Sequence, residues 1–174
     1  MDQQQPTPKP EPRAKEIAPS KLNKRRKTHG TRRGFFTPLH PEKYDGDINT
    51  ITYRSKMELR MMKYLDDQPS VLRWSSEETV IPYYSPLDKK MHRYFVDFKV
   101  ITKNRDGKIT TRLVECKWST ATVPPKEPKR KTRRYFAEQK NWIINQAKWT
   151  EAKKFCDQHG WEWMILTEKH LSGF

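Results

Sequence analysis

The clearest alternation of hydrophobic and polar positions along the chain lies in residues 93–102 (RYFVDFKVIT), and it predicts a β-strand. Residues 108–118 (KITTRLVECKW) predict a second strand, and residues 104–107 between them (NRDG) place glycine where a tight turn requires a positive φ. Residues 78–84 and 161–167 have shorter strand-like patterns. The two longer strands and their turn therefore predict an antiparallel hairpin.

Two segments instead have the apolar spacing of helices. Residues 55–67 begin with a capping-box pattern, Ser55 followed three positions later by Glu58, and end before Pro69. Residues 135–158 predict a longer helix that Gly160 is placed to terminate. The order helix–strand–strand–strand–helix–strand predicts an α/β fold, in which the long helix is the crossover between two parallel strands.

Composition divides the 174-residue chain into a tail and a domain. Only 33% of the residues are hydrophobic, and residues 1–34 combine 10 basic and 3 acidic side chains with many Gln and Pro residues. Such a segment buries too little surface to offset the entropy of ordering it. We therefore predict a disordered basic tail over 1–34 and a folded domain over 35–174, whose first residues, 35–50, form an irregular lead-in.

The amount and clustering of positive charge indicate which class of molecule the protein binds. The formal net charge is +15, and a second basic segment, 119–134, has 6 basic residues against 1 acid. Clustered Lys and Arg are typical of nucleic-acid binding because they displace counterions from phosphates; a solvated basic tail that only keeps the protein soluble is the alternative. No apolar run is long enough to cross a bilayer, no secretory signal is expected, and two cysteines fit a reducing cytosol.

The predicted hairpin places two carboxylates together. If residues 105–107 form a three-residue loop, the numbers of cross-strand partners sum to 212, as those of Asp97 and Glu115 do. Lys117 follows two residues after Glu115 and is expected on the same face. Opposed like charges destabilise a sheet, so this pair requires a cation, and Mg²⁺ prefers carboxylate oxygens. The opposite face is the expected core face: Tyr94, Val96, Phe98, Val100, Val114, Cys116 and Trp118.

These residues resemble a family. Asp97 followed by Glu115-Cys116-Lys117 is similar to the D…ExK signature of the PD-(D/E)xK, or restriction-endonuclease-like, nucleases, whose core has the element order predicted above. Val96 stands where the proline of the signature would be. With Glu58 on the preceding helix, the arrangement looks like the transposase endonuclease subunit TnsA. Over residues 35–170 the chain also resembles the head completion nucleases of T-even-type tailed bacteriophages, chiefly through residues 80–100 (VIPYYSPLDKKMHRYFVDFKV).

The resemblance implies a Mg²⁺-dependent DNA endonuclease, with Mn²⁺ as a substitute ion, that acts in phage head completion and virion assembly after DNA packaging. It implies DNA and head or portal proteins as partners, and a location in the host cytoplasm or the virion. The implied catalytic residues are Glu58, Asp97, Glu115 and Lys117. The implied metal ligands are Asp97, Glu115, the backbone carbonyl of Cys116, and Glu58, although Glu58 could instead complete the capping box.

Basic residues near the expected site and in the 119–134 segment are candidates for phosphate contacts, with ordinary surface charge as the alternative. They are Lys56, Arg93, Lys126, Lys129, Arg130, Lys131, Arg133 and Arg134. Two other functions remain open from the sequence. One is a non-catalytic assembly protein that binds DNA ends or the portal through its basic segments. The other is a TnsA-like transposition endonuclease, which would require a partner transposase.

Overall fold

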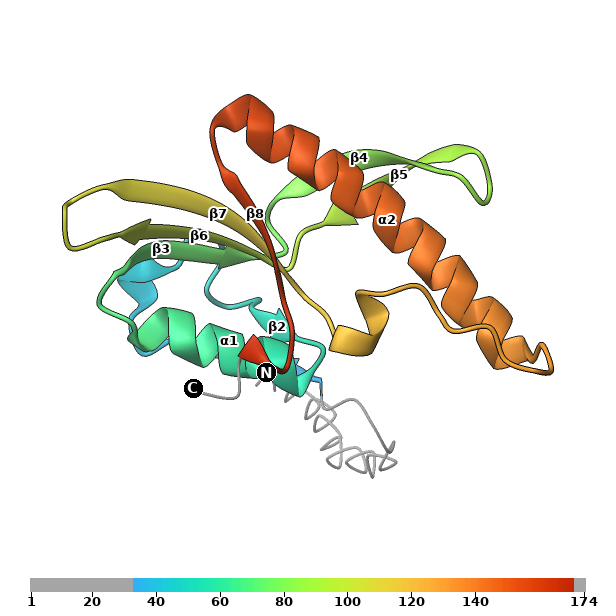
Figure 1. Ribbon diagram of the computed structural model, residues 1–174. Coiled ribbons are helices and arrows are strands. Elements are labelled where there is room, and N and C mark those ends of the chain that lie inside the picture. Colours follow the sequence, from blue (N-terminus) through green and yellow to red (C-terminus); the bar gives the residue numbers. More distant parts are fainter. Residues whose placement is uncertain (1–32, 171–174) are drawn as a thin grey trace, which may run out of the picture. The chain divides into compact units, whose positions relative to one another are not determined.

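A computed structural model describes residues 33–170, so the predicted tail lies outside the described residues except for its last two positions. The elements are β1 (Gly34–Phe35), η1 (Pro41–Lys43), β2 (Thr52–Tyr53), α1 (Lys56–Asp67), β3 (Val71–Ser76), β4 (Val80–Ser85), β5 (Lys90–Phe95), β6 (Phe98–Lys103), β7 (Ile109–Cys116), η2 (Ser119–Ala121), α2 (Arg133–His159) and β8 (Glu162–Leu166) (Figure 1). The predicted α/β class is confirmed. Among these residues, no helix has the length and apolar character needed to cross a membrane.

Four strands form the main sheet in the order β3-β6-β7-β8. β3 and β7 are each antiparallel to β6, whereas β8 is parallel to β7 and reaches it through α2. The predicted crossover is therefore confirmed. Without the separate β4–β5 hairpin, the order α1-β3-β6-β7-α2-β8 is the predicted helix–strand–strand–strand–helix–strand core.

The β6–β7 hairpin has the predicted register. Phe98 pairs with Val114 and Lys99 with Leu113, so partner numbers sum to 212. The turn is closed by a hydrogen bond from the Asn104 amide to the Lys108 carbonyl, and Gly107 has a φ of 82°. The turn sequence alone sets this register, because a left-handed residue at that position favours glycine.

The prediction of one continuous strand over 93–102 is wrong, because the chain bends between β5 and β6. Up to Phe95 it pairs with β4, and from Phe98 it pairs with β3. At the bend the Val96 amide donates to the Thr79 carbonyl, and the Glu77 amide donates to the Asp97 carbonyl. The segment β3–β4 and the segment β5–β6 therefore bend together where they pass between the main sheet and the β4–β5 hairpin, and Asp97 lies at this bend.

The strand predicted at 78–84 exists as β4, but its place is in the hairpin with β5 and not in the main sheet. The first strand of the main sheet is β3, which the sequence pattern did not reveal. Its register shifts between Val71 and Arg73, and both Trp74 and Ser75 are buried. A bulge of this kind breaks the alternation of polar and apolar positions on which strand prediction depends.

Both faces of the sheet are covered, which corrects the expectation of a single core face. One core lies on the α1 side and includes Phe98 and Val114; the other, between α2 and the β4–β5 hairpin, includes Tyr94 and Leu113 (Figure 1). Helices pack on both sides of the sheet, and the bend at residues 96–97 places Tyr94 and Val96 in one core and Phe98 and Val100 in the other. Trp118, also expected in the core, is 62% exposed.

Caps define both helices; those at Ser55 and Gly160 were predicted, and that at Thr132 was not. Ser55 caps α1 by accepting a hydrogen bond from the Glu58 amide. Thr132 caps α2 by accepting one from the Tyr135 amide, and Gly160 ends α2 in the left-handed conformation, with a φ of 65°. The α2 helix begins two residues earlier than predicted, so the last residues of the expected basic loop lie in its first turn.

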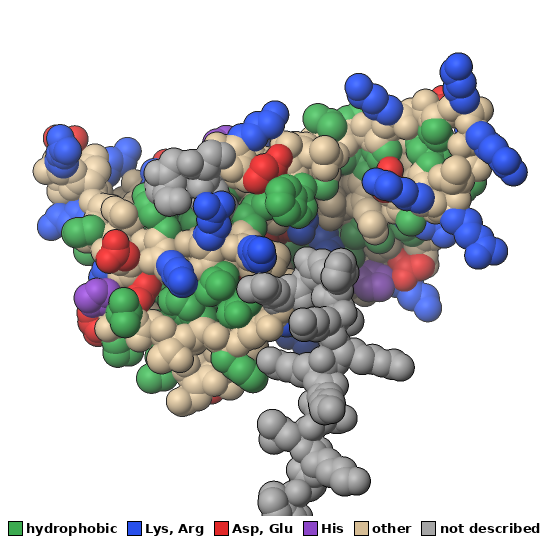
Figure 2. Space-filling view, turned by 90° about the horizontal axis from the view of Figure 1, so that it is seen from below, with side chains coloured by type: hydrophobic (Ala, Val, Ile, Leu, Met, Phe, Trp, Pro, Cys, Tyr) green, Lys and Arg blue, Asp and Glu red, His purple; other side chains and the backbone are tan. Residues whose placement is uncertain are grey.

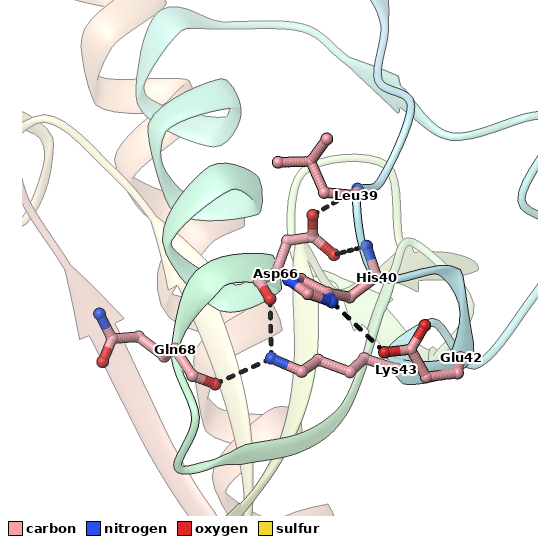
Figure 3. A network of polar contacts seen from close by, with 6 residues as sticks. All are labelled: Leu39, His40, Glu42, Lys43, Asp66 and Gln68. Carbon is pink, nitrogen blue, oxygen red and sulfur yellow. Dashed lines mark hydrogen bonds and ion pairs between the residues drawn. The ribbon is translucent and has the colours of Figure 1, made fainter.

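The lead-in at residues 35–50 is mostly irregular, as predicted, but it is fixed to the end of α1 (Figure 3). The buried carboxylate of Asp66 accepts hydrogen bonds from the Leu39 amide at 2.6 Å and the His40 amide at 3.2 Å. The Lys43 ammonium donates to the Asp66 and Gln68 carbonyls. These carbonyls lie at the helix C-terminus, where the helix itself offers no partner.

Asp66→Ala is expected to lower the free energy of unfolding by about 2 kcal/mol, because two amides lose a charged acceptor. Asp67→Ala is a matched control, since the Asp67 side chain is exposed. Urea unfolding followed by circular dichroism measures both. Equal stability of the two variants would show that Asp66 does not hold the lead-in.

Candidate active site

Asp97 lies where the β6–β7 ladder ends. The last backbone pair is Phe98 with Val114, and the Asp97 side chain continues the pairing, since its Oδ2 accepts a hydrogen bond from the Cys116 amide at 2.8 Å. Burial and, next, the negative charge of Glu115 raise the pKa of Asp97, whereas Lys117 and the Cys116 amide act in the opposite direction. Asp97 and Glu115 are therefore close enough for their charges to interact, but they are not the backbone pair that was predicted, because the ladder ends one pair earlier.

Glu115 is held on both carboxylate oxygens. Its side chain is buried within β7, where Oε1 lies 2.7 Å from the Lys117 ammonium and Oε2 accepts a hydrogen bond from the Tyr94 hydroxyl at 2.5 Å. A buried carboxylate requires such partners, because an unpaired charge away from water is costly. The two contacts fix the direction in which the carboxylate points.

Lys117 follows the last residue of β7, and its amide donates to the Leu166 carbonyl, which extends the pairing with β8 by one residue. Burial acts to lower the pKa of Lys117, but the charges of Glu115 and Asp97 outweigh it, and the pKa is raised. The structure therefore brings together Asp97, Glu115 and Lys117, as the spacing predicted.

Glu58 lies at the first turn of α1 and completes the capping box. Its Oε1 accepts from the Ser55 hydroxyl at 2.8 Å and its Oε2 from the Arg54 amide at 2.6 Å. Its charge nevertheless contributes to raising the pKa of Asp97. The rotamer present is the capping one, so a role of Glu58 as a metal ligand stays a prediction that would require this side chain to turn.

Two residues at the site were missed from the sequence. Tyr94, expected only as core, orients Glu115 through its hydroxyl. Lys148 of α2 lies over the rings of Tyr94 and Tyr83, 5.3 Å and 5.6 Å from their centroids. Burial, helped by the positive charge of Lys117, lowers the pKa of Lys148, whereas the charges of Glu115 and Asp97 act in the opposite direction. Lys148 belongs to no recognisable sequence motif, so the sequence could not indicate a role for it. Only the packing of α2 on the sheet places it near Glu115.

The basic residues predicted to contact DNA are all exposed: Lys56, Arg93, Lys126, Lys129, Arg130, Lys131, Arg133 and Arg134. Figure 2 shows Lys and Arg side chains gathered at the end of the molecule where Figure 1 places the first turns of α2 and the loop before it. Two of them have acidic neighbours, since Arg134 lies 2.8 Å from Glu138 and Lys131 lies 3.1 Å from Glu127. Arg93 belongs to β5 and lies over the Phe95 ring.

The donor set fits a hard cation that keeps much of its own hydration. Among residues 33–170, no group of three or more His, Cys, Asp or Glu side chains lies together as a ready-made metal cage. Asp97 and Glu115 offer two carboxylates beside one ammonium, and the raised pKa of Asp97 indicates that a further cation or a proton is needed to balance their negative charge. Mg²⁺ is commonly bound in this way, by one or two carboxylates, several waters and substrate phosphate oxygens.

Comparison with known proteins identifies the family of the chain. The family model described as TnsA-like endonuclease N terminal matches residues 68–168, which contain Asp97, Glu115 and Lys117 but not Glu58. A protein named head completion nuclease, from Enterobacteria phage T4, is 34% identical over 142 residues, which cover 79% of this chain and 92% of the phage protein. No solved structure matches the chain. The chain therefore belongs to the TnsA-like endonuclease family.

Proposed function

We propose that this protein is a Mg²⁺-dependent DNA endonuclease that acts in phage head completion, after DNA has been packaged. The observation that supports it best is the convergence of Asp97, Glu115 and Lys117 where β7 ends. The T4 relative supports the place in virion assembly. Its partners would then be DNA and proteins of the phage head or portal, in the host cytoplasm or the virion.

Each residue of the site has a proposed task. Asp97 and Glu115 would hold the metal ion, with the Cys116 carbonyl as a further oxygen ligand and Glu58 in support. When bound, the ion polarises the scissile phosphate and lowers the pKa of a bound water. Tyr94 keeps one Glu115 oxygen in place. The Lys117 ammonium orients the attacking water and stabilises the negative charge that develops on the phosphate.

Lys148 is proposed as a positioning residue. It lies against the ring face of Tyr94, whose hydroxyl donates to Glu115, so its positive charge reaches the carboxylates from the α2 side of the sheet. It has no ion pair with either carboxylate, whereas Lys117 does. The two lysines should therefore differ in how strongly cleavage depends on them.

Incubation of the full chain with supercoiled plasmid should give nicked and linear DNA with Mg²⁺ or Mn²⁺, and none with EDTA, because the two carboxylates require a cation to bind a phosphate. Gel electrophoresis measures the products, and a mobility shift in EDTA controls for DNA binding. DNA binding without cleavage under every metal condition would contradict the proposal. The protein would then be a non-catalytic assembly protein that binds DNA ends or the portal through its basic surface.

A further inference from the structure

A pocket of about 510 Å³ lies between the segment that follows β7 and the first half of α2. Its walls combine aromatic, aliphatic, amide and basic side chains. Those that bear on its chemistry are Trp118, Val123, Lys126, Arg134, Asn141 and Trp142. The volume lies in the range of small-molecule and cofactor sites. None of the proposed catalytic residues lines it, but Trp118 is the chain neighbour of Lys117.

Trp118 is held by its backbone while its indole remains exposed. On one side, the Lys117 amide donates to the Leu166 carbonyl at 2.8 Å. On the other side, the Ser119 amide donates to the Glu168 carboxylate at 2.8 Å. Trp118 is 62% exposed. With the backbone held on both sides, only the two side-chain torsions of the tryptophan have to be ordered when a flat ring stacks on it.

The opposite wall offers hydrogen-bonding groups at a fixed place. Asn141 and Asn145 are one turn apart on α2 and both line the pocket. Trp142 between them packs edge-on against the buried Trp149, with ring centroids 6.2 Å apart. Amide side chains of this kind pair with the edges of nucleobases.

Charge around the pocket favours an anionic ligand. Lys126 and Arg134 line it, and Arg134 also pairs with Glu138, a further lining residue. The neighbouring segment 129–133 adds four exposed basic residues. Stacking faces, base-pairing amides and phosphate-binding cations in one pocket are the combination by which proteins bind unpaired nucleotides.

We infer that this pocket binds an unpaired nucleobase of the DNA substrate, beside the bond that is cut; the inference deepens the proposed endonuclease function and rests on it. A base within an intact duplex is stacked on both faces and paired along its edge, so it can enter only after unstacking and unpairing, which cost free energy. The protein therefore favours DNA with unpaired bases, such as frayed ends, flaps and gaps, over continuous duplex.

The test uses the full chain in EDTA at one salt concentration, so that binding is measured without cleavage. Fluorescence anisotropy compares a 15-nucleotide oligothymidylate with a blunt duplex of equal length. Trp118→Ala should weaken single-strand binding about tenfold, because stacking on that ring is lost. Duplex binding should change less than twofold, since phosphate contacts are kept.

Trp118→Phe keeps an aromatic face and should restore most of the single-strand affinity, and its circular dichroism controls for folding. Phe35→Ala is the matched control, because Phe35 is 76% exposed and lies outside the pocket. Unchanged single-strand binding by Trp118→Ala, or equal losses for both DNA forms, would overturn the inference. So would a Trp118→Ala defect confined to binding of a head or portal protein, which would indicate a protein ligand.

These outcomes are separable from those of the plasmid assay. If the protein nicks plasmid with Mg²⁺ but binds single strands equally well with and without Trp118, the endonuclease function is supported and the nucleobase pocket is contradicted. If it binds single strands through Trp118 but never cleaves, the nucleobase pocket is supported and the endonuclease function is contradicted.

Discussion

Asp97→Asn is expected to reduce metal-dependent DNA cleavage by about 10³-fold, an effect of the size expected when electrostatic stabilisation of a transition state is removed. Asparagine has the same shape and keeps a carbonyl oxygen that can accept the hydrogen bond from the Cys116 amide, which Asp97 now accepts at 2.8 Å. The variant therefore removes a negative charge and leaves the end of the β6–β7 ladder in place. A supercoiled-plasmid assay across a range of enzyme concentrations measures the loss.

A thermal measurement separates this role from a general loss of folding. Without metal, Asp97→Asn should be no less stable than wild type, because the substitution relieves repulsion between Asp97 and the buried Glu115. Added Mg²⁺ should raise the melting temperature of wild type, since a ligand bound only by the folded state stabilises it, and should leave the variant unchanged. Asp106→Asn, an exposed substitution at the other end of the same hairpin, is the matched control.

The Asp97 prediction has a clear contrary result. Cleavage by Asp97→Asn at the wild-type rate would remove Asp97 from the metal site and with it the reason to place a nuclease centre at this bend. A Mg²⁺-induced rise in melting temperature equal to that of wild type would show that the ion binds elsewhere.

Lys117→Met is expected to reduce cleavage by at least about 10²-fold and to cost about 1–2 kcal/mol of stability. Methionine preserves the length and apolar part of the side chain but leaves the Glu115 Oε1 without the ammonium that lies 2.7 Å away. The stability loss is smaller than for a fully buried pair, because the Lys117 side chain is 31% exposed. Plasmid nicking and urea unfolding measure the two effects.

Lys148→Met tests whether position matters more than charge. It removes the same charge from the same site, but Lys148 lies against the tyrosine rings and has no ion pair with Glu115. We expect its cleavage rate to fall less than tenfold. Equal losses for the two lysine variants would show that Lys117 contributes only to the overall potential and does not act on the phosphate or the water.

A double variant separates stability from chemistry. Glu115→Gln removes the buried negative charge that requires a cation, so Lys117→Met should cost much less stability in that background than alone. Cleavage by the double variant should be lost, because both a proposed metal ligand and the ammonium are missing. If Lys117→Met lowers the free energy of unfolding as much in the Glu115→Gln background as in wild type, the ion pair is not the reason that Lys117 stabilises the fold.

Local chemistry made several features predictable from the sequence. The turn at residues 104–107 fixed the hairpin register because Gly107 occupies the position that requires a positive φ. Ser55 and Gly160 marked helix ends because each satisfies backbone groups within its own turn. Register, in turn, placed Glu115 and Lys117 on one side of the chain and Asp97 near them.

Contacts between residues distant in the sequence decided the rest. The bend at Val96–Asp97 results from the change of partner from β4 to β3, and no local pattern marks that change. β3 was hidden by its bulge. The Glu58 rotamer is an exception, because the neighbouring Arg54 and Ser55 hold it, but the sequence could not choose between this cap and a metal site.

The amino-acid sequence by itself determined the register of the hairpin, the ends of α1, the end of α2 and the placement of Glu115 and Lys117 on one side of β7, because each depends on residues a few positions apart. Only the tertiary structure decided that both faces of the sheet are buried, that Tyr94 and Lys148 lie behind Glu115, and that Trp118 faces an open pocket. These depend on how α1, α2 and the β4–β5 hairpin pack against the sheet, and packing energy is shared among residues that no short segment contains.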